Sequence, residues 1–155
     1  MSDFAQRRFS VGLLVTLALT SPALLAAPQV ITLTQLPCQF LQSEDGHDRG
    51  YRSTSADECK QINAATGEQR VANATPLTLK AGDYIFRVTN KNVPYSLGFW
   101  LRGDGLLARA TLPSVSGGGL ETGTTLDYRI HLTPGEYRYS CPLNPTPDYK
   151  LVVTP

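Results

Sequence analysis

Three cysteines and one histidine are the residues of this chain whose chemistry is most specific. Cys38, Cys59 and Cys141 are its three cysteines, and His47 lies between the first two. Thiolate and imidazole together suit Cu(I) or Zn(II), so these four residues are the candidate metal ligands. The acidic run 44–48 adds oxygen ligands, but such a run is also typical of a solvated loop. No C-x-x-C or fixed Cys/His spacing is present, so the pattern alone names no metal.

The first 27 residues have the composition of an export signal. Arg7 and Arg8 precede an apolar run over residues 11–25, and Ala26-Ala27 offers a cleavage site between small residues. We therefore expect a signal peptide at 1–27 and a single domain at 28–155 that is exported, most simply to the periplasm. A retained membrane anchor is the alternative.

Charge and cysteine count limit what the exported domain can do. Outside the first 27 residues the chain has 12 basic and 12 acidic residues, which argues against a nucleic-acid partner. No later segment is apolar enough to span a bilayer, so we expect no membrane span in the mature chain. An oxidising compartment favours disulfides, and three cysteines allow one internal disulfide and leave one thiol.

Alternating apolar residues dominate the second half of the chain and predict strands. The spacing predicts strands at 29–34, 77–79, 84–88, 97–101, 106–112 and 126–132, and one on each side of Cys141. Residues 113–123, with Gly117, Gly118 and Gly119, are expected to form a flexible loop. Ser55 and Glu58 form a capping box that predicts one short helix at 55–65. Seven or eight short strands with one helix predict an all-β Greek-key sandwich or barrel.

Two stretches of sequence resemble the cupredoxin family. The phrase LKAGDYIFRVTNKNVPYSLGFWL is similar to the second and third cupredoxin strands and the loop near them. The phrase LTPGEYRYSCPLNPTPDYKLVV is similar to the last hairpin. The resemblance covers roughly residues 29–36 and 75–155, with 37–70 as an insertion after the first strand. It is greatest to the cupredoxin-like domain of periplasmic iron-uptake proteins, whose two cysteines correspond to Cys38 and Cys141.

The same resemblance shows which copper ligands the chain lacks. A type 1 copper centre uses two histidines, one cysteine and usually an axial methionine. The first histidine would lie near residues 94–96, and the second would follow Cys141, where Asn144 and Pro145 stand instead. The only methionine is Met1. A normal type 1 copper site is therefore not expected.

The resemblance also implies that distant cysteines meet. In a cupredoxin sandwich Cys38, the insertion and Cys141 would gather at one end. We expect a disulfide there, with Cys38–Cys141 preferred and Cys38–Cys59 as the alternative. The other interpretation is a metal site formed by Cys38, Cys59, Cys141 and His47, in which copper is favoured over iron or zinc.

No catalytic motif is present, so we do not expect an enzyme. The first functional hypothesis is a metal-handling periplasmic protein, accessory to iron or copper transport, whose partner is a membrane metal transporter or a periplasmic redox protein. The second is a metal-free, disulfide-containing module for protein contact. Electron transfer through a non-standard copper centre is a weaker third. Trp100 and the loop with Gly117, Gly118 and Gly119 are the candidate contact residues.

Overall fold

The structure is a computed structural model in which residues 27–155 are described. The predicted export signal therefore lies, except for Ala27, outside the described residues. Within residues 27–155 no helix has both the length and the apolar character needed to cross a membrane.

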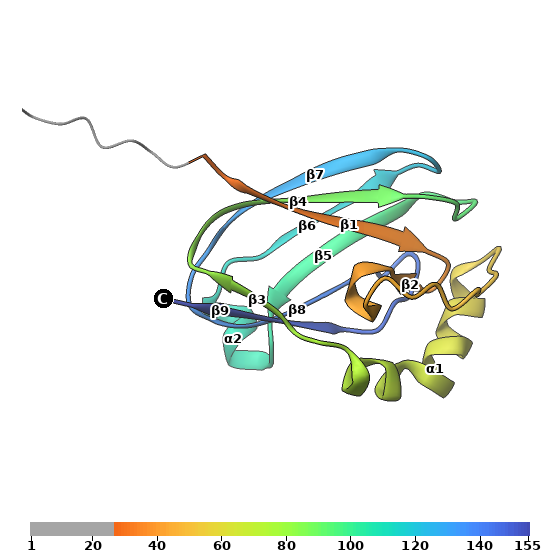
Figure 1. Ribbon diagram of the computed structural model, residues 1–155, viewed down its shortest axis with the longest axis horizontal. Coiled ribbons are helices and arrows are strands. Elements are labelled where there is room, and N and C mark those ends of the chain that lie inside the picture. The colour runs from red at the N-terminus through yellow and green to blue at the C-terminus, as the bar shows by residue number, and fades with distance from the viewer. Residues whose placement is uncertain (1–26) are drawn as a thin grey trace, which may run out of the picture.

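Two β-sheets pack face to face and enclose the core (Figure 1). The first sheet has the spatial order β2 (Gln39–Phe40), β1 (Gln29–Leu36), β4 (Gly82–Asn90) and β7 (Thr125–Leu132). The second has the order β3 (Leu77–Lys80), β9 (Tyr149–Thr154), β8 (Gly135–Ser140), β5 (Leu97–Gly103) and β6 (Val115–Leu120). Parallel pairing of β1 with β4 and of β3 with β9 joins strands that are distant in sequence. The expected all-β sandwich is confirmed.

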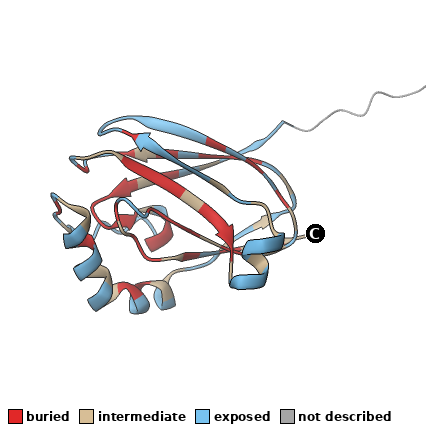
Figure 2. Ribbon diagram, turned by 180° about the vertical axis from the view of Figure 1, so that it is seen from behind, coloured by how far each residue is buried: buried red, intermediate tan, exposed pale blue. Residues whose placement is uncertain are grey.

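Apolar and polar residues alternate along the strands, so one face of each sheet is apolar. These two faces pack against each other and form a core rich in aromatic side chains. Phe99 of β5 stacks on Phe86 of β4 with ring centroids 5.4 Å apart. Phe40 meets Phe99 edge-on at 6.1 Å and also contacts Tyr139. Such stacked and edge-on pairs add to the stabilisation from burial. Figure 2 shows that buried residues are concentrated along the strands and that most of both helices is exposed.

The helix in the insertion is longer than predicted. The α1 helix (Ala56–Asn73) begins where the capping box placed it, and Ser55 Oγ accepts a hydrogen bond from the backbone N–H of Glu58 at 3.4 Å. It continues past residue 65 because no strong helix breaker occurs before Pro76, and Gly67 costs only about 1 kcal/mol inside a helix. The polar segment between β1 and β3 also contains a single 3-10 turn, η1 (Gln42–Glu44).

Two of the predicted elements are wrong. Residues 106–112 are not a strand, because the short helix α2 (Leu106–Thr111) occupies them, with Leu106 and Leu107 90% and 78% exposed. Residues 113–123 are not a loop, because β6 pairs there with β5 as the edge of its sheet. Only glycine permits this close pairing. A Cβ on Gly98 would lie 2.5 Å from the carbonyl oxygen of Gly117.

Candidate functional site

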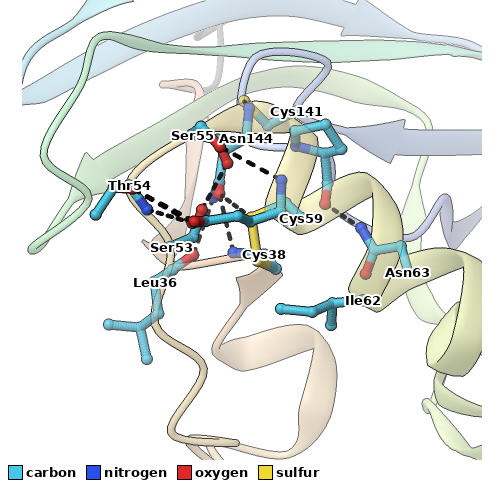
Figure 3. The surroundings of a disulfide bond; sticks show 12 residues. Leu36, Cys38, Ser53, Thr54, Ser55, Cys59, Ile62, Asn63, Cys141 and Asn144 are labelled. Atoms are coloured by element: carbon cyan, nitrogen blue, oxygen red, sulfur yellow. Dashed lines mark hydrogen bonds between the residues drawn. A yellow bond between two sulfur atoms is a disulfide. The ribbon is translucent and has the colours of Figure 1, made fainter.

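The candidate site lies at the end of the sandwich where β1 ends, β5 begins and Cys141 follows β8. We call this end the thiol pole. The side chain of Gln35, near the end of β1, donates a hydrogen bond to the carbonyl of Gly98 in β5 at 2.8 Å. The first turn of α1 covers the same end, so the insertion and the last loop meet there (Figure 3).

The disulfide joins Cys38 to Cys59, with the two Cα atoms 5.0 Å apart. Cys38 is the common member of both pairings that the sequence left open, but the preferred pairing with Cys141 is wrong. A tight turn after β1, in which Cys38 has φ 64°, directs the chain back into β2. The first turn of α1 then brings Cys59 against Cys38, while Cys141 stays a free, buried cysteine.

The Cys141 thiol lies in a cage of backbone donors. Its Sγ accepts hydrogen bonds from the N–H of Gly98 at 3.4 Å and from the N–H of Asn144 at 3.2 Å. Burial raises the pKa of the Cys141 thiol, and these hydrogen bonds offset the increase only in part. The sulfur is therefore a protonated thiol at neutral pH, and only 1% of the residue is exposed.

Asn144 is the central polar residue of the thiol pole. Its Oδ1 accepts a hydrogen bond from the N–H of Cys38 at 2.9 Å and lies 3.3 Å from Cys59 Sγ. Its Nδ2 donates to the carbonyl of Leu36 at 2.9 Å and to Oε1 of Gln35 at 3.3 Å. Asn144 is fully buried, so each of these bonds satisfies a group that water cannot reach.

A second amide shapes the loop where the resemblance would place the first histidine. Asn90 donates from Nδ2 to the carbonyls of Val93, Tyr95 and Leu120, and its Oδ1 accepts from the N–H of Val93 at 2.9 Å. The Tyr95 hydroxyl lies 3.9 Å from Cys59 Sγ, and burial raises its pKa. The loop therefore brings a phenol, and no imidazole, to the thiol pole.

A buried ion pair holds the insertion against the sandwich, and sequence reasoning missed it. Glu44 accepts hydrogen bonds from Arg70 at 2.6 Å and from the hydroxyl of Tyr149 at 2.5 Å, and both charged side chains are at least 97% buried. Burial alone would raise the pKa of Glu44, but hydrogen bonds from Arg70, Tyr149 and Arg49 outweigh it and lower that pKa. The acidic run 44–48 therefore contains one structural carboxylate, and it is not wholly a solvated loop.

His47 does not join the cysteines. It is exposed and lines a small cavity together with Arg70 and Asn73, near the C-terminal end of α1. Cys59 lies at the other end of that helix, roughly 20 Å away along its axis at 1.5 Å per residue. No group of three or more His, Cys, Asp or Glu side chains is placed to hold a metal ion in the part of the chain that the structure describes.

A type 1 copper centre does not fit the donor set of the thiol pole. Among the described residues Cys141 is the only free thiol. Its neighbours are amides and backbone N–H groups, where copper would need imidazoles. The other two sulfur atoms are covalently paired and cannot act as thiolates. The four candidate ligands that the sequence suggested are therefore not assembled as one metal site in this structure.

The candidate contact residues lie beside the thiol pole. Gly117, Gly118 and Gly119 belong to the edge strand β6, where the sequence predicted a loop. A Cβ on Gly117 would lie 2.9 Å from the Tyr128 ring, and Gly119 has φ 78°. The backbone structure therefore favours glycine at two of these three positions. Trp100 is partly exposed on the outer face of the adjacent strand β5. Its role in protein contact stays a prediction.

Solved structures resemble this chain in fold at low sequence identity. No model of a protein family matches it, and no curated protein matches it. The structure of auracyanin B superposes with a TM-score of 0.52 at 16% identity, over 84% of this chain and 92% of that one. Auracyanin A, a "blue" copper protein from the green thermophilic photosynthetic bacterium Chloroflexus aurantiacus, gives a TM-score of 0.46 at 18% identity over 83% of this chain and 100% of that one. The fold is therefore the cupredoxin-like β-sandwich.

Proposed function

We propose that this protein is an exported cupredoxin-fold module without type 1 copper that acts by contact with another protein. The observation that carries the proposal is the set of buried hydrogen bonds made by Asn144. This residue occupies the position where the second copper histidine would follow Cys141. Its amide forms buried hydrogen bonds to Leu36, Cys38 and Gln35. The residue that occupies the ligand position therefore stabilises the pole in a metal-free form.

The disulfide supports the same proposal. Cys38–Cys59 is fully buried and links the insertion to the end of β1, which is a structural use of cysteines. Disulfides of this kind persist in oxidising compartments, which fits a periplasmic location. We further propose that the module is not catalytic, since its one buried thiol has a raised pKa and no paired base.

Metal handling is the second candidate function. The arrangement of sulfur atoms around Asn144 supports it only when the disulfide is reduced. Cys59 Sγ and Cys141 Sγ contact Asn144 from two sides, through Oδ1 at 3.3 Å and through the backbone N–H at 3.2 Å. Reduction of the disulfide would leave three thiols around this residue, and thiols of this kind suit Cu(I). A metal-handling role accessory to iron or copper transport would therefore require the reduced protein.

A metal titration separates these two functions. Copper, zinc and iron are each added to the purified protein, with the disulfide intact and after reduction, and the Cys141→Ala variant is the control. We expect the oxidised protein to bind none of the three more tightly than the variant does. Stoichiometric binding by the oxidised protein that Cys141→Ala abolishes would contradict the proposal. Binding by the reduced protein alone would favour the metal-handling function.

A further inference from the structure

An apolar groove of about 390 Å³ lies on the outer face of the second sheet, beside the thiol pole. Trp100 of β5 forms one end, and Leu143, 46% exposed, forms the other. The floor between them includes Gly118, whose missing side chain leaves the space open, because a Cβ there would face Leu143. The groove is therefore long enough for one large side chain and is bounded along one side by a strand.

That strand is an unprotected sheet edge. The β6 strand is the last in the order of its sheet, and Val115–Leu120 contains no charged residue and no proline. Natural edge strands usually carry such residues, because unpaired backbone N–H and C=O groups otherwise accept another strand. The edge and the groove together have the form used in recognition by strand addition, in which the backbone pairs and a pocket selects a side chain.

One exposed arginine without an ion pair in the described range, Arg109, lies at the Trp100 end of the groove. The guanidinium of Arg102 stacks 4.0 Å from the centroid of the indole and is paired with Asp148. The guanidinium of Arg109 lies 5.9 Å from the same ring and forms no ion pair with any residue in the range 27–155. No acidic side chain from residues 27–155 lines the groove. A ligand with a carboxylate at this end would complement the unpaired arginine.

We propose that β6 binds an extended segment of a partner protein by strand addition, with one large apolar side chain in the groove and an acidic side chain toward Arg109. This inference rests on the proposed function, because it names the contact surface of that module. A second copy of the chain fits less well. Its own β6 would present only Ser116 and Gly118 on this face and would leave the space between Trp100 and Leu143 unfilled.

The test uses a phage-displayed library of random dodecapeptides, selected against the purified protein with its disulfide intact. We expect the selected peptides to share a large apolar residue two positions from Asp or Glu, which is the spacing of one strand face. A synthetic consensus peptide should protect the backbone amides of β6 from hydrogen exchange. Failure to enrich any such pattern would overturn the inference.

Two variants locate the contact. Gly118→Leu should fill the groove and weaken the consensus peptide at least about tenfold. Its Cβ would lie 3.8 Å from Leu143, an ordinary contact, and Gly118 does not have positive φ, so the variant is expected to fold. Arg109→Glu should reverse the charge preference toward Lys or Arg. Arg129→Glu, at an exposed arginine on β7 without an ion pair in the described range, is the matched control and should leave affinity unchanged.

The outcomes also separate this inference from the proposed function. Peptides that bind both groove variants as tightly as the original protein, or that protect amides away from β6, would overturn the inference and leave a contact module intact. The metal titration judges the proposed function without reference to the groove.

Discussion

The backbone N–H of Cys38 donates a 2.9 Å hydrogen bond to Oδ1 of Asn144, although the two residues are 106 positions apart. The bond joins the turn after the first strand to the loop between the last two. Through the same amide, Asn144 also bonds to Leu36. One side chain thus connects both ends of the domain.

Replacing Asn144 with alanine should therefore weaken the whole domain. Asn144→Ala leaves the N–H of Cys38 and the carbonyl of Leu36 buried without partners, and each such group costs about 1–3 kcal/mol. We expect the free energy of unfolding to fall by about 2–4 kcal/mol in urea titrations. The exposed Asn92→Ala is the control. A loss no larger than that of the control would show that the amide does not connect these segments.

Removal of the disulfide should release α1 more than the sandwich. Only Cys59, Gly67 and Arg70 of this 18-residue helix are buried, so few apolar contacts retain it. Replacing Cys38 and Cys59 together with alanine should cost about 3 kcal/mol for a loop of this length. Hydrogen exchange should accelerate throughout α1 and much less in β4. Equal acceleration in both elements would mean that the helix is held mainly by other contacts.

Cys141 should be the single free thiol and should be inert in the folded protein. It is buried, and burial raises its pKa, so thiolate is scarce at neutral pH. An alkylating reagent should label no thiol in native buffer and one in denaturant without reductant. Peptide mapping should place the label on Cys141. A label on Cys59 would instead show that Cys38 is paired with Cys141.

Because of Glu44, the free energy of unfolding should decrease at acid pH. Its folded-state pKa lies below the usual 4.5, so the carboxylate stabilises the fold above that value, and the stabilisation is lost as pH falls through the folded pKa. Glu44→Gln leaves Arg70 buried without its charged partner and should cost about 3–5 kcal/mol at neutral pH. The stabilities of the two proteins should converge in acid. The exposed Glu68→Gln should follow the original protein at every pH, and a constant gap for Glu44→Gln would contradict the prediction.

Adjacent glycines of β6 should respond differently to a single methyl group. An alanine Cβ at Gly117 would lie 2.9 Å from the Tyr128 ring, whereas at Gly118 the nearest atom is 3.8 Å away. Gly117→Ala should lower the free energy of unfolding by about 1–3 kcal/mol, as overpacking does. Gly118→Ala should change it little. Equal thermal stability of the two variants would show that the Tyr128 ring moves aside freely.

The sequence by itself was enough for the sandwich, because period-two alternation states which face of each strand is buried. It also showed that imidazole ligands are missing near residues 94–96 and after Cys141, because only a histidine can supply an imidazole and the sequence has none there. The strand predicted at residues 106–112 was wrong, because an apolar run of that length does not distinguish a short helix from a strand. The loop predicted in the glycine-rich segment that forms β6 was wrong as well. The pairing of β6 with β5 depends on how closely Gly98 allows the two backbones to approach, which the sequence does not show.

Only the tertiary structure decided the chemistry of the thiol pole. Three cysteines allow three pairings, and the choice of Cys59 over Cys141 depends on where the first turn of α1 lies against the turn at Cys38. Likewise, Glu44 and Asn144 look like ordinary polar residues in sequence. Their partners Arg70, Tyr149 and Cys38 come from distant segments, and such contacts exist only once the sheets have closed and excluded water.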